Sequence, residues 1–103
     1  MKRTLSKVKN LEKFIEKHGD DPFISQSISK MLDYKIKNYE AEIKKLDKEL
    51  KMFEHTYNMK SSAFYKKFTE GKLGDTMDFI EWSSLYQMYN RLLEKKVELE
   101  GKK

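Results

Sequence analysis

Apolar residues recur at alternating steps of four and three through the middle of the chain. This repeat, called the seam below, comprises Leu32, Ile36, Tyr39, Ile43, Leu46, Leu50, Phe53 and Tyr57. A spacing that averages three and a half residues places these side chains on one narrow stripe of a helix, where a partner helix packs. Asp21 before Pro22 is a helix-start signal, and Asn58 tolerates the left-handed conformation found at helix ends. The pattern predicts one long helix over residues 22–57.

The remaining apolar pattern predicts three further helices. A first helix over about residues 5–18 stops at Gly19, and a very short one over about residues 63–70 stops at Gly71. A last helix over about residues 77–100 carries apolar side chains on two faces, so we expect it to contact two neighbours.

Short polar side chains mark the expected starts of the last two helices. Ser61 or Ser62 precedes the short helix, and Asp75 or Asp78 lies where the last helix begins. These residue types accept a hydrogen bond from the backbone N–H groups at a helix start. We therefore expect one of each pair to cap its helix.

The composition agrees with a helical protein. The chain has 103 residues, of which 38% are charged and 13% aromatic, with four glycines and one proline. Such a length indicates a single domain, residues 1–103. We predict an all-α fold in which the long central, coiled-coil-type helix packs against the N- and C-terminal helices, as a helical hairpin or a three-to-four-helix bundle.

The charges beside the seam indicate what it packs against. With Ile36 at position a of the heptad, every e position is acidic (Asp33, Glu40, Asp47, Glu54) and every b position is lysine (Lys30, Lys37, Lys44, Lys51). In a parallel in-register pair of this helix Lys35 would attract Glu40, but two acid–acid contacts would repel, and an antiparallel pair would set acidic e positions against each other. Self-pairing through the seam is therefore disfavoured. We expect a partner with basic flanks, which the chain itself offers on its first helix (Lys7, Lys9, Lys13, Lys17) and its last (Arg91, Lys95, Lys96).

Residue patterns for catalysis are absent from the sequence. It has no cysteine, its two histidines are 37 residues apart, and no nucleophile motif or phosphate-binding glycine loop occurs. We therefore expect no enzyme activity, no catalytic residue, no cofactor and no metal ion. Asp75, Asp78 and Glu81 complement the dipole at a helix start, and a site for a cation or a basic partner is the alternative.

Aromatic residues are concentrated in the second half of the chain. Some must hold the short and last helices together, but their number exceeds what one small core encloses. Aromatic side chains are enriched at protein interfaces. We therefore expect a protein partner, or a homo-oligomer through the aromatic surface, to contact a set of partner-binding residues: Phe64, Phe68, Phe79, Glu81, Trp82, Tyr86 and Tyr89.

Part of this region resembles a known family. Residues 53–92 contain F-x-x-G-x-L-G-D from Phe68 and D-F-x-E-W from Asp78, with Met59 upstream. This pattern is similar to that of short bacterial and archaeal antitoxin-like helical proteins, in which a Gly stands where this chain has Asn58. The resemblance implies a non-catalytic protein–protein interaction role, with a small toxin as partner, and gives importance to Phe79, Glu81 and Trp82. Residues 1–31 lack the strand alternation with which such antitoxins often begin.

The charge distribution leaves an alternative function open. The net charge is +5, and the first 18 residues carry six basic and two acidic side chains. A helical nucleic-acid-binding module would use these basic residues on phosphates: Lys2, Arg3, Lys7, Lys9, Lys13 and Lys17. No apolar run is long enough for a membrane span or follows the N-terminus as in a signal peptide, so we expect a cytoplasmic protein without a membrane partner.

Overall fold

The structure, a computed structural model, describes residues 2–101, apart from the side chain of Lys2. The described residues form four helices and no strand: α1 (Lys2–His18), α2 (Pro22–Tyr57), α3 (Ser61–Thr69) and α4 (Met77–Glu100). The predicted all-α fold is confirmed, including the packing of the long helix α2 against α4 and α3. Packing of α2 against the N-terminal helix stays a prediction.

The ends of α2 follow from local chemistry. Asp21 Oδ1 accepts a hydrogen bond from the backbone N–H of Ile24 at 2.9 Å, which satisfies one of the free donors at the helix start. Asn58 ends the helix with φ at 51°, and the N–H of Met59 reaches back to the carbonyl oxygen of Glu54 at 3.2 Å. Capping interactions therefore define both ends of α2, at Asp21 and at Asn58.

The chain divides into two compact units, Met1–Asp33 and Tyr34–Lys103. In the first unit, α1 ends at His18 and is followed by Gly19, whose φ of 86° is easily reached only by glycine. Leu11 and Ile15 of α1 are half-buried, whereas Leu5 and Phe14 are exposed. The first unit therefore buries little apolar surface.

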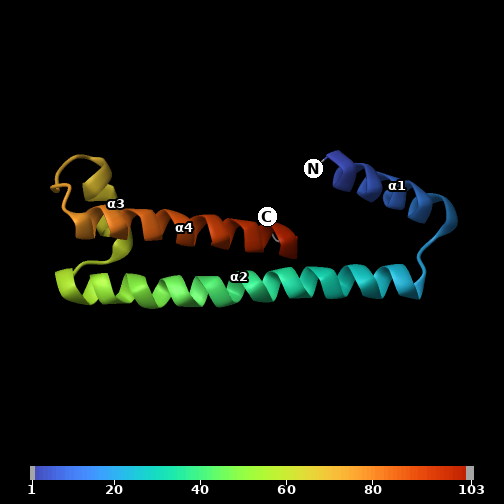
Figure 1. The fold of residues 1–103 in the computed structure, drawn as a ribbon, viewed down its shortest axis with the longest axis horizontal. Coiled ribbons are helices and arrows are strands. Elements are labelled where there is room, and N and C mark those ends of the chain that lie inside the picture. Colours follow the sequence, from blue (N-terminus) through green and yellow to red (C-terminus); the bar gives the residue numbers. More distant parts are fainter. Residues whose placement is uncertain (1, 102–103) are drawn as a thin grey trace. The chain divides into compact units, whose positions relative to one another are not determined.

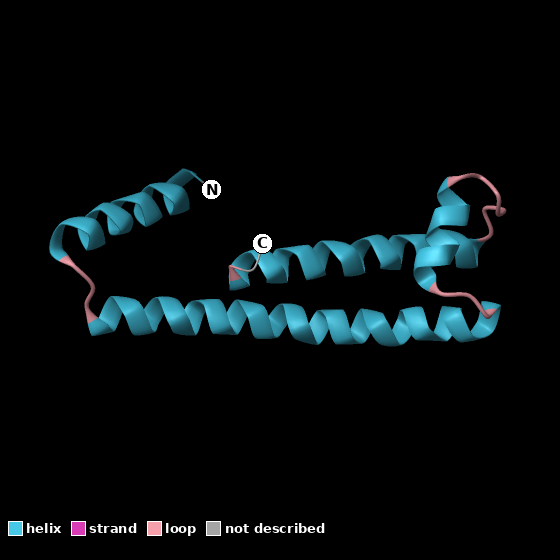
Figure 2. Cartoon of the chain, turned by 180° about the vertical axis from the view of Figure 1, so that it is seen from behind, coloured by secondary structure: helices cyan, strands magenta, loops and turns pink. Residues whose placement is uncertain are grey.

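In the second unit, α4 runs antiparallel beside the C-terminal half of α2 (Figures 1 and 2). The ring of Trp82 stacks with that of Tyr57 at 5.7 Å, and farther along Lys96 Nζ lies 3.6 Å from Glu40 Oε2. The seam faces this contact: Leu46 is buried and the rest of the seam within the unit is at least half-buried. The predicted pairing of the acidic flank of α2 with a basic residue of the last helix is confirmed for Lys96 and Glu40.

The predicted caps of α3 and α4 were wrong. Lys60 occupies the cap position of α3 without a side-chain hydrogen bond, and Ser61 is already helical. Thr76 caps α4, where its Oγ1 accepts from the N–H of Phe79 at 3.3 Å. Both aspartate candidates lose this role to Thr76, because its extended backbone places the hydroxyl at the helix start. Asp78 lies in the first turn instead.

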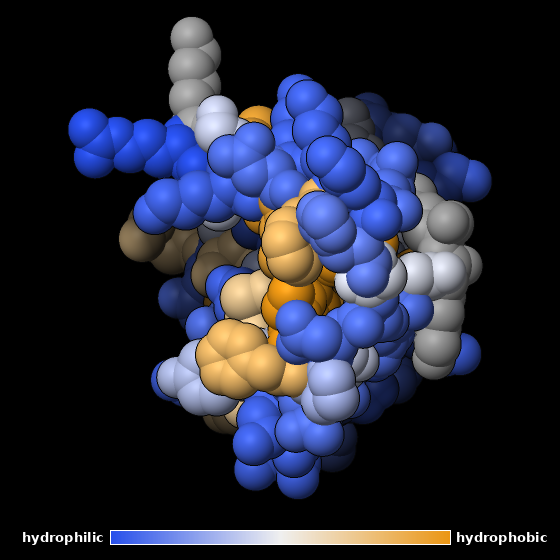
Figure 3. Space-filling model, turned by 90° about the vertical axis from the view of Figure 1, so that its right-hand side faces the viewer, coloured by the Kyte–Doolittle hydropathy of each residue, from blue (hydrophilic) through white to orange (hydrophobic). Residues whose placement is uncertain are grey.

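Charged and polar side chains dominate the surface, as Figure 3 shows for one side of the molecule, with a smaller set of hydrophobic side chains exposed among them. Among the described residues, the buried apolar side chains are Leu46, Leu50, Phe64 and Trp82. All four belong to the second unit. The second unit therefore contains the core, together with the predicted partner-binding residues.

Candidate functional site

The core of the second unit is a stack of aromatic rings around Trp82. The ring of Phe64 from α3 lies parallel to the indole, with 3.9 Å between centroids and 4° between planes. Phe53 of α2 stacks with the same indole at 5.6 Å. Phe64 and Trp82 have no exposed surface. Three helices therefore meet at one tryptophan, and burial of the large rings holds them together.

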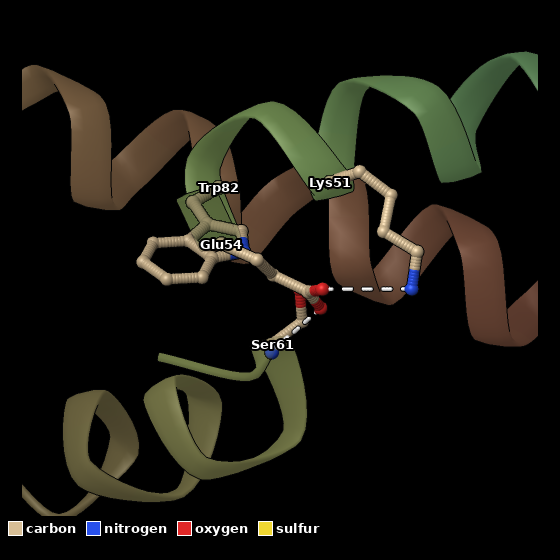
Figure 4. Close-up of polar contacts among 4 residues, drawn as sticks. All are labelled: Lys51, Glu54, Ser61 and Trp82. Atoms are coloured by element: carbon tan, nitrogen blue, oxygen red, sulfur yellow. Dashed lines mark hydrogen bonds and ion pairs between the residues drawn. The ribbon is translucent and has the colours of Figure 1, made fainter. Parts of the chain in front are cut away.

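A chain of polar groups leads from Trp82 in this core to the exposed side chain of Lys51 (Figure 4). The indole Nε1 of Trp82 donates to Ser61 Oγ at 2.9 Å, and the backbone N–H of Ser61 donates to Glu54 Oε2 at 2.9 Å. Lys51 Nζ lies 3.6 Å from Glu54 Oε1. Glu54 therefore caps α3 in place of Lys60, whose side chain makes no capping hydrogen bond. Through its two hydrogen bonds, Ser61 connects α2, α3 and α4.

The hydrogen bonds of Glu54 outweigh its burial. Desolvation by burial raises the pKa of this carboxyl. The hydrogen bonds from Ser61 and the charge of Lys51 lower the pKa by a larger amount, so that it lies below the usual 4.5. Glu54 is therefore held ionised at the start of α3, where a negative charge also complements the helix dipole.

The predicted partner-binding residues divide by burial. Phe64 and Trp82 are core residues that offer no surface to a partner in this structure. The other five keep exposed surface: Phe68, Phe79, Tyr86 and Tyr89 are half-buried and Glu81 is exposed. A partner-binding role stays a prediction for these five.

An open groove of about 230 Å³ lies between α2 and α4. We call it the acidic groove. Its lining residues are Glu49, Met52, Phe53, Thr56, Asp78 and Glu81. Among the residues that the structure describes, the lining contains three carboxylates and no basic side chain, and Met52 is 69% exposed. A surface with an apolar floor and an acidic rim matches an apolar segment that carries lysine or arginine.

The sequence indicated only part of this groove. Glu81 was among the predicted residues, whereas Glu49, Met52 and Thr56 were not, because they lie beside the seam on α2. The exposed Met52 is the one signal that was missed, since a large apolar residue outside the seam has no partner in the predicted helix pair.

Tyr57 fixes one acid of the groove. Its hydroxyl donates to Asp78 Oδ2, which links the end of α2 to the first turn of α4. This hydrogen bond, together with burial and the charge of Asp78, raises the pKa of the Tyr57 hydroxyl. Asp75, Asp78 and Glu81 form no group among the described residues that could hold a metal ion.

A second open groove involves two of the predicted tyrosines. Tyr86 and Tyr89 line it with residues of α2 and the start of α3, among them Asp47, Lys51 and Lys60. The Tyr86 ring also lies 5.2 Å from that of Tyr65 on α3. This groove has charges of both signs, so it selects a partner's charge less clearly than the acidic groove does.

The basic residues of the alternative hypothesis belong to α1. Arg3, Lys7, Lys9, Lys13 and Lys17 are exposed, and the side chain of Lys2 lies outside the described residues. Steps of four place Lys9, Lys13 and Lys17 on one side of the helix. The structure therefore brings at least three of the predicted phosphate contacts onto one helix face.

Comparison with known proteins adds no relative. The chain matches no protein-family model, and neither a curated protein nor a solved structure matches it significantly. Within the described residues, no helix is both long enough and apolar enough to cross a membrane.

Proposed function

We propose that this chain is a non-catalytic protein–protein interaction module of the prokaryotic antitoxin type, acting in the cytoplasm, and that the acidic groove binds a basic helical segment of its partner. The observation that carries the proposal is the lining of the groove: an apolar floor with the exposed Met52 beside Glu49, Asp78 and Glu81, and no basic side chain within the described part of the chain. The resemblance of residues 53–92 to antitoxin-like proteins suggests a small toxin as the partner.

The rigid support of the groove favours recognition. Phe53 lines the groove and also stacks on the buried Trp82, so the floor is continuous with the aromatic core. Asp78 is held by Tyr57. Preorganised groups lose less conformational entropy on binding than mobile ones do. A partner helix would thus meet a surface that is already shaped.

Affinity purification from the native host tests this function. We expect the tagged chain to retain one small basic protein in stoichiometric amount, and Glu49→Arg to lose it, since the variant places a positive charge in the groove. Glu42→Arg, at an exposed acid of α2 outside the groove lining, should retain it.

Co-expression then tests the antitoxin role. The retained protein alone should arrest growth, and the wild-type chain but not Glu49→Arg should restore it. A wild-type chain that retains no stoichiometric protein would contradict the proposal, and so would a retained protein that Glu49→Arg binds as well.

The second candidate function is nucleic-acid binding by α1, which the shared face of Lys9, Lys13 and Lys17 favours. Six phosphate contacts from the basic residues predict binding that falls with salt with a log–log slope of roughly −5. Lys9→Glu should lower the affinity for duplex DNA of any sequence and make this slope shallower. Absence of retained DNA or RNA at about 50 mM salt, where such contacts are strongest, would exclude it.

A further inference from the structure

Helix α4 has a second face, opposite the one that packs on α2. Counted in steps of four and three, this face contains Met77, Glu81, Ser84, Met88, Arg91 and Lys95, which we call the outer stripe. The relative exposure of Met77 is 81% and that of Met88 is 44%, and the other four side chains are exposed as well. Two of its six side chains, Met77 and Met88, are apolar, and among the described residues no element of the second unit covers the stripe.

We propose that the outer stripe pairs with the outer stripe of a second copy of this chain in an antiparallel homodimer. The inference goes beyond the proposed function, because it needs no other protein, although Glu81 belongs both to the outer stripe and to the lining of the acidic groove. It rests on the exposure of the stripe and on the order of its charges.

The charges of the outer stripe complement the stripe itself when it is reversed. Glu81 lies toward the N-terminal end and Arg91 toward the C-terminal end, ten residues or about 15 Å apart along the helix. At that distance they cannot pair within one helix. In an antiparallel coiled coil, a positions of one helix lie level with d positions of the other. With Glu81 as an a position and Arg91 as a d position, each Glu81 meets Arg91 of the second copy, twice per dimer.

The centre of the outer stripe can pack closely in the same register. Ser84 of one copy lies level with Met88 of the other, again twice. A small side chain opposite a long flexible one forms the knob-into-hole contact of a coiled coil, and Met adapts to the available space. At each end, Met77 meets the aliphatic stem of Lys95, whose ammonium group stays in water.

Parallel pairing is disfavoured by the same residues. It would set Glu81 against Glu81 and Arg91 against Arg91, so that both charged layers repel. The outer stripe therefore specifies the direction of pairing as well as the partner. A two-fold axis near the middle of α4 gives a closed dimer.

Sedimentation equilibrium of the purified chain tests the dimer. The wild-type protein should pass from 12.4 kDa to twice that mass between about 1 μM and about 1 mM, the range expected of a small interface. Glu81→Arg and Arg91→Glu, each alone, should raise the dissociation constant by about tenfold or more, because both charged layers become repulsive. Met88→Glu should abolish association. Lys37→Glu, an exposed reversal on α2, should leave it unchanged.

Mixing the two single variants gives the sharpest result. A Glu81→Arg copy and an Arg91→Glu copy offer each other opposite charges in both charged layers, so the mixture should form a heterodimer although neither variant forms a homodimer. Circular dichroism checks that each variant is folded. We expect wild-type helical content in all of them, because all the substituted positions are exposed. A wild-type chain that stays at 12.4 kDa, a mixture that stays monomeric, or a Lys37→Glu variant as weak as Arg91→Glu would overturn the proposal. None of these outcomes depends on the partner of the acidic groove.

Discussion

Ser61 is the residue on which three helices depend. It accepts the indole N–H of Trp82 through Oγ and donates its own backbone N–H to Glu54. Among the described residues, no buried side-chain polar atom lacks a partner. The single hydroxyl of Ser61 therefore completes the polar pairing of an otherwise aromatic core.

Replacing this hydroxyl should be costly. Ser61→Ala leaves the buried Nε1–H of Trp82 without an acceptor, which should lower the free energy of unfolding by about 1–3 kcal/mol in urea denaturation. Ser62→Ala is the matched control, because Ser62 is the exposed neighbour and should change it by less than about 0.5 kcal/mol. Equal effects at the two serines would show that the indole hydrogen bond contributes little.

Glu54 should make stability depend on pH. Its folded-state pKa lies below the usual 4.5, so its stabilising contribution is present above that value and is lost as the pH falls through the folded pKa. Glu54→Gln keeps an oxygen for the N–H of Ser61 but removes the charge. The wild-type advantage in unfolding free energy should therefore be larger at about pH 7 than at about pH 3. An advantage that is the same at both would contradict the ionised cap.

The end of α2 is decided by one left-handed residue. Asn58 has φ at 51°, a conformation that costs most residues with a Cβ atom about 1 kcal/mol or more. Asn58→Ala should therefore lower the free energy of unfolding by about 1 kcal/mol, whereas Asn58→Gly should leave it equal or slightly higher. Thermal or urea unfolding distinguishes the pair, and equal losses in both variants would mean that the Asn side chain itself is required.

The elements were more predictable than their contacts. The spacing of the seam and the signals at Pro22 and Asn58 define α2 from local sequence alone. The cap of α3 was not predictable, because Ser61 is used by Trp82, a residue 21 positions away. The hydroxyl of Ser61, which could cap a helix by itself, accepts a tertiary hydrogen bond instead. Rules based on neighbouring residues in the sequence do not include such long-range contacts.

The acidic groove shows the same limit for the site. In the sequence, Glu49 lies beside the seam and Asp78 is a candidate for the start of the last helix, and only the antiparallel pairing of α2 with α4 brings them to one groove. The aromatic cluster was recognised, but its division into buried Trp82 and half-buried Tyr86 depends on where α3 packs. Composition can count aromatic residues but cannot assign each to core or surface.

Over the whole molecule, stability should reside in the second unit. All the buried apolar side chains among the described residues lie between Leu46 and Trp82. A chain that begins at residue 34 should therefore keep cooperative unfolding in urea, followed by circular dichroism. A peptide of residues 1–33 should be only partly helical and melt without a sharp transition, since short helices are marginal alone in water. Loss of cooperativity in the shorter chain would instead favour the predicted single domain, with α1 as part of its core.

Trp82 also gives the protein its own optical reporter. It is the only tryptophan in the chain, it has no exposed surface, and its ring contacts bring together α2, α3 and α4. Its fluorescence therefore reports the assembly of the three helices as a single event, without an attached dye. Because the indole is remote from solvent, a quencher dissolved in water reaches it only when the helices separate, so the quenching rate measures how often the core opens.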